Sequence, residues 1–135
     1  MYHKILVPVA FDDDAKIEAA LDIARVLAAE DAQIVLLHVI EHVPSYAVQY
    51  IPEDLRKAAH DGIQAELKRL AGTVPGGRGV LIEGHAGRTI LDYVDEKKMD
   101  CVVIASHRPG MADYLLGSTA AQVVRHAPCA VMVTR

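Results

Sequence analysis

The sequence predicts a single α/β domain with one open, five-stranded parallel sheet and helices on both of its faces. Short apolar runs alternate along the chain with segments whose apolar residues recur every three or four positions. The runs are continuously apolar, as in strands that are covered on both faces. The chain has 135 residues, 52% of them hydrophobic, which suits one domain with one sizeable core. We therefore expect residues 1–135 to form that domain.

Five apolar runs are expected to be strands, of which the third is the shortest and is flanked by glycines. In chain order they are Ile5–Ala10, Ile34–Ile40, Val80–Ile82, Cys101–Ala105 and Cys129–Val133. Strands that alternate with helices form parallel sheets through right-handed crossovers. Ligands of such sheets bind beyond the carboxyl ends of the strands, where the strand order reverses. A site is therefore expected in the segments that follow Ala10, Ile40, Gly84 and Ala105.

Four helices are predicted between the strands. The first carries an apolar stripe over residues 17–28, and the second repeats an apolar residue every four positions over residues 55–67 and stops at Gly72. The third runs from about Arg88 to Lys98, with Ile90, Leu91 and Val94 inward, and the fourth starts near Ser118 and ends before Pro128.

The connection Glu41–Pro52 is longer than the other loops that follow strands. It carries Tyr46 and Tyr50, which suit a flap over a site, but an ordinary surface loop fits the same residues equally well.

Composition argues against several partners. The net charge is −4, Trp is absent and there is a single Phe, so nucleic acid and anionic membranes are poor partners. No apolar run has the length of a membrane span, and no signal peptide precedes the first strand, so we expect a cytoplasmic protein without membrane insertion. Cys101 and Cys129 are expected to be reduced thiols, and no metal-binding spacing occurs.

The loop after the fourth strand leads from Ser106 to the helix start at Gly117-Ser118-Thr119. The first turn of a helix offers unpaired N–H groups and the positive end of the dipole, which together attract anions. Gly117 lets phosphate oxygens approach the backbone, the hydroxyls of Ser118 and Thr119 can donate to them, and Arg108 can add a charge-assisted contact. The chemistry predicted here is phosphate binding.

A simpler interpretation is that Ser118 or Thr119 only caps the helix. Thr119 and Gln122 have the spacing of a capping box. Capping and phosphate binding do not exclude each other, and the position of the loop at the end of a strand favours a ligand site.

The stretch Ser106–Arg135, with Leu-Leu-Gly-Ser at 115–118 and Val-Val-Arg-His-Ala-Pro-Cys at 123–129, resembles the signature of universal stress proteins. The segments 4–9 and 37–40 are similar to the family as well, so the resemblance covers the whole chain. It implies a Rossmann-like adenine-nucleotide-binding fold with strand order 3-2-1-4-5.

The chain departs from the pattern of the ATP-binding members, which is Gly, two residues, Gly, nine residues, then Gly and Ser or Thr. Ala105 and Arg108 stand at the first two glycine positions, and eight residues separate Arg108 from Gly117. The Ser-His-Arg-Pro segment nevertheless resembles a short bacterial, nucleotide-binding subgroup in which Arg replaces the second glycine. Ala10 stands where the family usually has Asp.

The resemblance implies a site for ATP, or for AMP or another adenine nucleotide, with or without Mg. The backbone of Val39 would contact the adenine edge, Pro8 and Val9 would line the base pocket, and Ile104 and Ala105 would lie beneath the sugar. The full set of expected binding residues is Pro8, Val9, Ala10, Val39, Ile104, Ala105, Ser106, His107, Arg108, Gly110, Gly117, Ser118 and Thr119.

Three further features have two interpretations each. Asp12, Asp13 and Asp14 follow the first strand, and Asp13 is a weak candidate for a magnesium contact; we favour an acidic cap of the first helix. His38 is expected to be packed and hydrogen-bonded rather than catalytic. The turn at residues 84–87 is expected to serve backbone geometry first and ligand shape second.

The predicted function is that of a universal stress protein that binds an adenine nucleotide and regulates an unknown partner protein as a homodimer. The dimer would form through the strand Cys129–Thr134 at a sheet edge. The alternative is a universal stress protein that binds no nucleotide and acts only through protein contacts. We expect no catalytic residues and slow ATP hydrolysis at most, because neither a general base nor a phosphate loop after the first strand is present.

Overall fold

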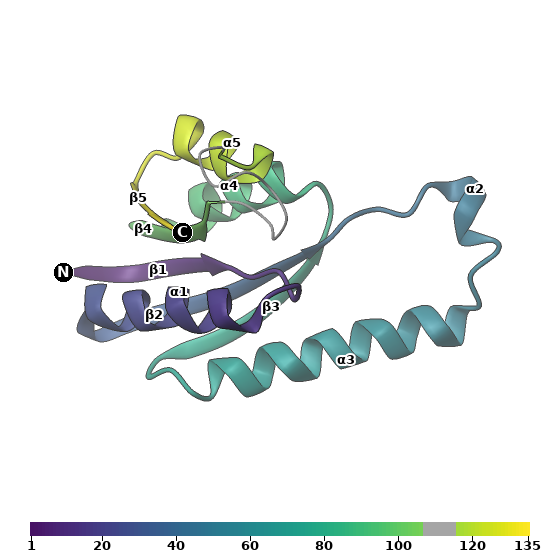
Figure 1. The fold of residues 1–135 in the computed structure, drawn as a ribbon, viewed down its shortest axis with the longest axis horizontal. Coiled ribbons are helices and arrows are strands. Elements are labelled where there is room, and N and C mark those ends of the chain that lie inside the picture. Colours follow the sequence, from purple (N-terminus) through teal and green to yellow (C-terminus); the bar gives the residue numbers. More distant parts are fainter. Residues whose placement is uncertain (107–115) are drawn as a thin grey trace.

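A computed structural model describes residues 1–106 and 116–135 of the chain (Figure 1). The elements follow one another in the order β1 (Tyr2–Pro8), α1 (Asp14–Leu27), β2 (Ala28–Ile40), α2 (Ser45–Val48), α3 (Glu53–Ala71), β3 (Gly77–Glu83), α4 (Ala86–Lys97), β4 (Cys101–Ala105), α5 (Ser118–His126) and β5 (Ala130–Thr134).

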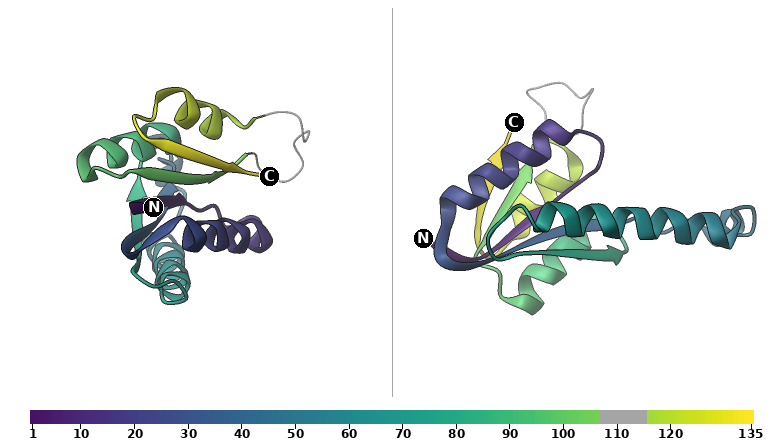
Figure 2. Two further views of the ribbon diagram at one scale, coloured as in Figure 1. Left: turned by 90° about the vertical axis from the view of Figure 1, so that its left-hand side faces the viewer. Right: turned by 90° about the horizontal axis from the view of Figure 1, so that it is seen from below.

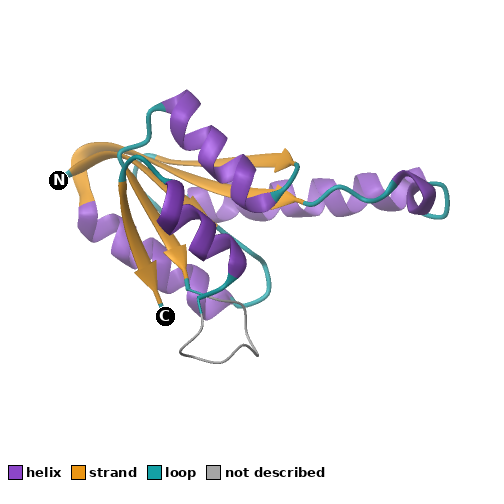
Figure 3. Ribbon diagram, turned by 90° about the horizontal axis from the view of Figure 1, so that it is seen from above, coloured by secondary structure: helices purple, strands orange, loops and turns teal. Residues whose placement is uncertain are grey.

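The five strands form one parallel sheet in the order β3-β2-β1-β4-β5 (Figure 3), which confirms the predicted fold class. Strand β1 lies at the centre, next to β2 on one side and β4 on the other. The strand order reverses between β1 and β4, so their carboxyl ends border the position where sheets of this kind bind ligands.

Two helices cover each face of the sheet (Figures 1 and 2). Helices α1 and α3 pack on the face that carries Ile5 and Val7 of β1, and helices α4 and α5 pack on the face that carries Leu6. Because successive residues of a strand point to opposite faces, a strand covered on both sides must be continuously apolar, as the first run is.

Helix α1 begins as predicted. The carboxylate of Asp13 accepts a hydrogen bond from the backbone N–H of Ala15 at 3.0 Å and from that of Lys16 at 3.4 Å, so Asp13 is the N-cap. The interpretation of the acidic segment as a helix cap is therefore confirmed for Asp13.

Helix α1 ends one residue earlier than its apolar stripe predicts, and strand β2 begins six residues earlier. Residues 28–33 are rich in Ala and acidic residues, which favour a helix, yet Ala28 pairs with Tyr2 and Gln33 pairs with Lys4 of β1. Pairing with the central strand overrides the local preference. The predicted end of β2 at Ile40 and both ends of Cys101–Ala105 are confirmed, and the ends of the other three strands differ by one to three residues.

Helix α3 extends beyond the sheet (Figure 1). Its buried residues are Leu67, Leu70 and Ala71 near the C-terminal end, whereas 61% of Leu55 is exposed. The apolar repeat of residues 55–67 therefore predicts the helix correctly, but only its C-terminal end is buried against the sheet.

The long connection between β2 and α3 contains the short helix α2, which lies at the far end of the projection (Figure 1). Tyr46 and Tyr50 are 73% and 79% exposed. The hypothesis of a flap over a site is wrong for the chain on its own, because these residues lie with the projecting helix and away from the strand ends.

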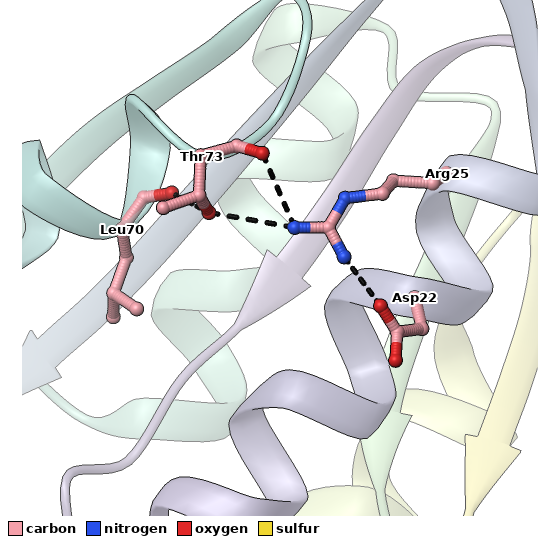
Figure 4. A network of polar contacts seen from close by, with 4 residues as sticks. All are labelled: Asp22, Arg25, Leu70 and Thr73. Atoms are coloured by element: carbon pink, nitrogen blue, oxygen red, sulfur yellow. Dashed lines mark hydrogen bonds and ion pairs between the residues drawn. The ribbon is translucent and has the colours of Figure 1, made fainter.

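A polar network joins helix α1 to the end of α3 (Figure 4). The Arg25 guanidinium donates to the Asp22 carboxylate on its own helix, to the Thr73 carbonyl at 3.2 Å and to the Thr73 hydroxyl at 3.4 Å. The Thr73 hydroxyl in turn donates to the Leu70 carbonyl at 2.7 Å. Arg25 thereby places a cation just beyond the C-terminus of α3, where positive charge is favourable.

Among the described residues, no helix is both long and apolar enough to cross a membrane.

Candidate functional site

A cleft of about 640 Å³ lies at the carboxyl ends of β1, β2 and β4, beside the start of α5. Ten of the residues expected from the sequence line it: Pro8, Val9, Ala10, Val39, Ile104, Ala105, Ser106, Gly117, Ser118 and Thr119. The other three, His107, Arg108 and Gly110, lie outside the described residues. The fold thus brings four separated segments of the chain together at the predicted place.

The N-terminus of α5 has no side-chain cap among the described residues. Gly117 is the N-cap, Ser118 is the first helical residue, and the Ala121 N–H donates to the Gly117 carbonyl at 2.8 Å. The simpler interpretation, that Ser118 or Thr119 caps the helix, the latter with the capping-box spacing to Gln122, is therefore wrong. Because no side chain of residues 1–106 or 116–135 takes the first N–H groups, they are available to a ligand in the cleft.

Gly117 is buried, and its backbone angles of φ −62° and ψ 156° are open to any residue. The glycine is thus not required by a left-handed turn. A small residue at this point instead leaves room beside the helix start.

Ser106 connects the end of β4 to both flanking elements. Its N–H donates to the Thr134 carbonyl and its carbonyl accepts from the Gly117 N–H, both at 2.7 Å. The residue is only 4% exposed, yet its hydroxyl has no hydrogen-bond partner among the described residues. A buried hydroxyl without a partner is unusual and costs stability, so a missing acceptor or donor in the cleft is indicated.

The other end of the cleft is apolar. Val9 and Ile104 are 6% and 5% exposed, and Val39 packs against the core cluster that contains Ile104. The Val9 N–H donates to the Leu37 carbonyl at 2.8 Å, which continues the pairing of β1 and β2 by one residue beyond β1. This geometry fits a flat apolar group near the strand ends.

His38 holds the segment after β1 in place. Its Nδ1 lies 2.7 Å from the Val9 carbonyl oxygen, and its ring centroid lies 5.0 Å from that of Phe11. The expectation of a packed, hydrogen-bonded histidine is confirmed.

Several polar residues line the cleft in addition to the expected binding residues: Asp12, Lys16, Glu41, His85 and Gln122. Asp12 lines the cleft, whereas Asp13, the weak candidate for a magnesium contact, is the cap of α1. Asp12 lies just before the N-cap of α1 and Lys16 lies in the first turn of this helix, so both follow the carboxyl end of β1. A search for polar residues around the start of α1 would have found this pair.

The turn before α4 approaches α5 closely. A Cβ on Gly87 would lie 2.1 Å from Oε1 of Gln122, so a larger residue there would displace the end of the Gln122 side chain. The His85 side chain accepts from the Arg88 N–H at 3.4 Å and is the N-cap of α4. These contacts agree with the expectation that the turn at residues 84–87 serves backbone geometry first.

The arrangement suits binding more than catalysis. One end of the cleft offers backbone N–H groups, hydroxyls and the positive end of a helix dipole, and the other end offers apolar walls. No group of three or more His, Cys, Asp or Glu side chains within residues 1–106 and 116–135 is placed to hold a metal ion.

Comparison with known proteins gives a consistent result. The model of the universal stress protein family matches residues 1–135. Universal stress protein G of Salmonella typhimurium is 32% identical over 143 residues, covering 100% of both chains.

Solved structures agree with this match. The universal stress protein UspA from Lactobacillus plantarum is 28% identical, with a TM-score of 0.75 over 99% of this chain and 98% of that chain. A universal stress protein from Archaeoglobus fulgidus in complex with dAMP has the same fold, with a TM-score of 0.67 at 18% identity over 99% of this chain and 98% of that chain.

Proposed function

The chain belongs to the universal stress protein family, and we propose that it binds an adenine nucleotide in the cleft at the strand ends and acts as a regulatory dimer. The nucleotide's phosphates would lie at the start of α5 and its base between the ends of β1 and β2. Binding, rather than turnover, is the proposed role of the site.

The observation that carries this proposal is the phosphate end of the cleft. The first turn of α5 has no side-chain cap in the described part of the chain, and the buried Ser106 hydroxyl beside it has no partner. A phosphate group satisfies both deficits at once, because its oxygens accept from backbone N–H groups and from hydroxyls. Arg108, in the undescribed loop, is proposed to add a charge-assisted contact.

The base end supports an adenine ring in particular. Adenine presents a flat apolar face and a polar edge, which match the apolar wall formed by Val9 and Ile104 and the backbone of Val39 at the end of β2. The A. fulgidus relative was solved with dAMP, which supports the same ligand class. ATP is the proposed ligand; AMP fits the same chemistry with fewer phosphates.

Regulation is proposed to work through a homodimer formed by β5. This strand lies at the edge of the sheet and leaves Met132 40% exposed. An unpaired strand edge readily accepts a second copy of itself across a two-fold axis. Slow hydrolysis of bound Mg-ATP is the most that this site would support, since no candidate general base was found from the sequence.

Gly117→Val tests the placement of the phosphates. A branched side chain beside the helix start would block the approach of phosphate oxygens while the backbone angles stay allowed. We expect ATP affinity, measured by calorimetry, to fall at least about a hundredfold, since several charge-assisted hydrogen bonds are lost. ATP or AMP should also be released by heating the purified wild-type protein and be absent from the variant.

The matched control is Gly62→Val, on the exposed part of α3, where an added Cβ meets nothing within 4 Å. This variant should bind like the wild type. Equal ATP affinity in the Gly117→Val variant and the wild type would contradict the proposed site.

The second candidate is a family member that acts only through protein contacts. It is favoured by Ala10, which lines the cleft but offers no side-chain hydrogen bond to a nucleotide. A heat extract without nucleotide, together with no calorimetric signal for Mg-ATP or AMP, would establish this alternative.

A further inference from the structure

A second pocket, of about 300 Å³, lies at the opposite end of the sheet from the cleft. It is enclosed by the amino-terminal parts of β1, β2 and β3 and by the C-terminal half of α4. The residues that matter for its chemistry are Lys4, Gln33, Arg78, Tyr93 and Lys97, and none of the described lining residues is acidic.

The strand register explains why these side chains meet. Lys4 pairs with Gln33, and Arg78 pairs with Val35, two residues further along β2. Since side chains two apart point to the same face, Lys4 and Gln33 share the α4 face with the core residues Leu6 and Val35. The polar residues therefore begin where the apolar core beneath α4 ends.

Three cations converge on this pocket from three elements. The Lys4 ammonium donates to the Lys97 carbonyl at 2.8 Å. The negative end of the α4 dipole therefore stabilises the charge of Lys4 and also that of Lys97. Arg78 lies on β3, so the end of α4 does not explain why a cation is present there. Neither the Arg78 nor the Lys97 side chain forms an ion pair with a described residue.

The acidic residue Asp100 follows the lining residue Met99 in the chain. Its carboxylate accepts from the backbone N–H groups of His3 and Lys4 at 2.9 and 3.0 Å, and it is not among the residues that line the pocket. The positive charge of the pocket is therefore not neutralised by a lining carboxylate.

Tyr93 adds a neutral donor. It lines the pocket and is only 8% exposed. Because its hydroxyl is a hydrogen-bond donor, it complements the three cations around a ligand oxygen.

We propose that this pocket binds a phosphate-bearing small molecule, held by Lys4, Arg78 and Lys97 and by the Tyr93 hydroxyl. A guanidinium matches two phosphate oxygens in a bidentate fork, and two ammonium groups add compact charges. Three cations suit a multiply charged phosphate or diphosphate better than a single carboxylate. The site is separate from the nucleotide cleft and does not depend on it.

The test uses pyrophosphate as the probe, at constant ionic strength, on the Gly117→Val variant, in which the nucleotide cleft is blocked. Backbone amide shifts in two-dimensional NMR spectra should change saturably for residues 76–78 and 97–99. Arg78→Gln should weaken the affinity about tenfold, as expected for the loss of a charged hydrogen bond. Tyr93→Phe should weaken the affinity several-fold. Any loss in the free energy of unfolding of this variant should be too small to unfold the protein.

The matched control is Lys57→Gln, which removes an exposed cation from α3 outside the pocket. It should leave the affinity unchanged. Equal weakening by Lys57→Gln and Arg78→Gln, or shifts that do not saturate, would overturn the proposal. Equal affinity for a tricarboxylate would overturn the assignment to phosphate, and shifts confined to residues 117–119 would show binding at the cleft alone.

Discussion

The Ser106 hydroxyl is expected to lower the stability of the ligand-free protein and to raise its affinity for a nucleotide. It is buried without a partner among the described residues, which costs stability, and it lies where a phosphate oxygen would accept a hydrogen bond from it. The two effects have opposite signs and are measured separately.

Ser106→Ala should therefore raise the free energy of unfolding of the ligand-free protein by about 1 kcal/mol and lower ATP affinity about tenfold. Urea unfolding and calorimetry measure the two quantities. Ser45→Ala on α2 is the control and should change neither. A loss of stability in the Ser106→Ala variant would show that the hydroxyl has a partner in the free protein.

Cys101 is also buried, at 1% exposure, and burial together with the charges of Cys129 and Asp100 raises the pKa of its thiol from 9.0 to about 11. Below pH 9 both the folded and the unfolded chain keep this proton, so the ionisation of the thiol does not make the stability depend on pH there. Between pH 9 and 11 the unfolded chain loses the proton first, so stability falls as the pH rises.

Cys101→Ala should remove part of this pH dependence. We expect the free energy of unfolding of the wild type, relative to the variant, to fall by about 2 kcal/mol between pH 9 and pH 11. Urea unfolding at several pH values measures the difference. An identical slope in both proteins would mean that Cys101 is solvated in the folded state.

At the scale of elements, α3 shows how far local sequence determines a helix. Glu53 and Asp54 in its first turn and Lys68 and Arg69 in its last turn complement the helix dipole, so both ends are favourable locally. The extent to which α3 is buried was not predictable from the sequence. The apolar repeat specifies a stripe along the helix, but it does not specify how much of the helix the sheet covers. Strand β3 contacts only the C-terminal part.

The exposed part of α3 gives a test at this scale. Gly62 lies in the helix interior, and an added Cβ would meet nothing within 4 Å. Gly62→Ala should raise the free energy of unfolding by up to about 1 kcal/mol, because alanine loses less backbone entropy in a helix. Urea unfolding measures it, with Gly79→Ala as the contrasting variant: its Cβ would lie 2.9 Å from Leu67 Cβ, so that variant should be less stable.

At the scale of the whole molecule, the two sheet edges differ. Strand β3 is flanked by the projecting α3, whereas Met132 of β5 and Val124 of α5 are 40% and 45% exposed. The edge formed by β5 is where the proposed homodimer would form.

Met132→Lys should therefore weaken the dimer at least about tenfold, since it places a charge at the apolar part of the proposed interface. Sedimentation velocity over a range of concentrations measures the monomer fraction. Leu55→Lys, on the exposed projection, is the matched control and should leave the dimer intact. If both variants dissociate equally, β5 does not form the dimer interface.

The sequence by itself determined the features that depend on neighbouring residues. These are the continuous apolar runs of the central strands, the Asp13 cap of α1 and the glycine at the start of α5. Together with the family resemblance, they predicted the sheet order and the place of the cleft.

The tertiary structure alone decided what depends on residues far apart in the chain. It turned residues 28–33 into a strand, left the Ser106 hydroxyl without a partner among the residues that the structure describes, brought Gln122 against Gly87, and gathered Lys4, Arg78 and Lys97 around one pocket. Strand pairing and burial are long-range interactions, and their energies exceed local preferences wherever the two disagree. For that reason the position of the cleft was predictable, whereas its hydrogen-bond deficits and the second pocket were not.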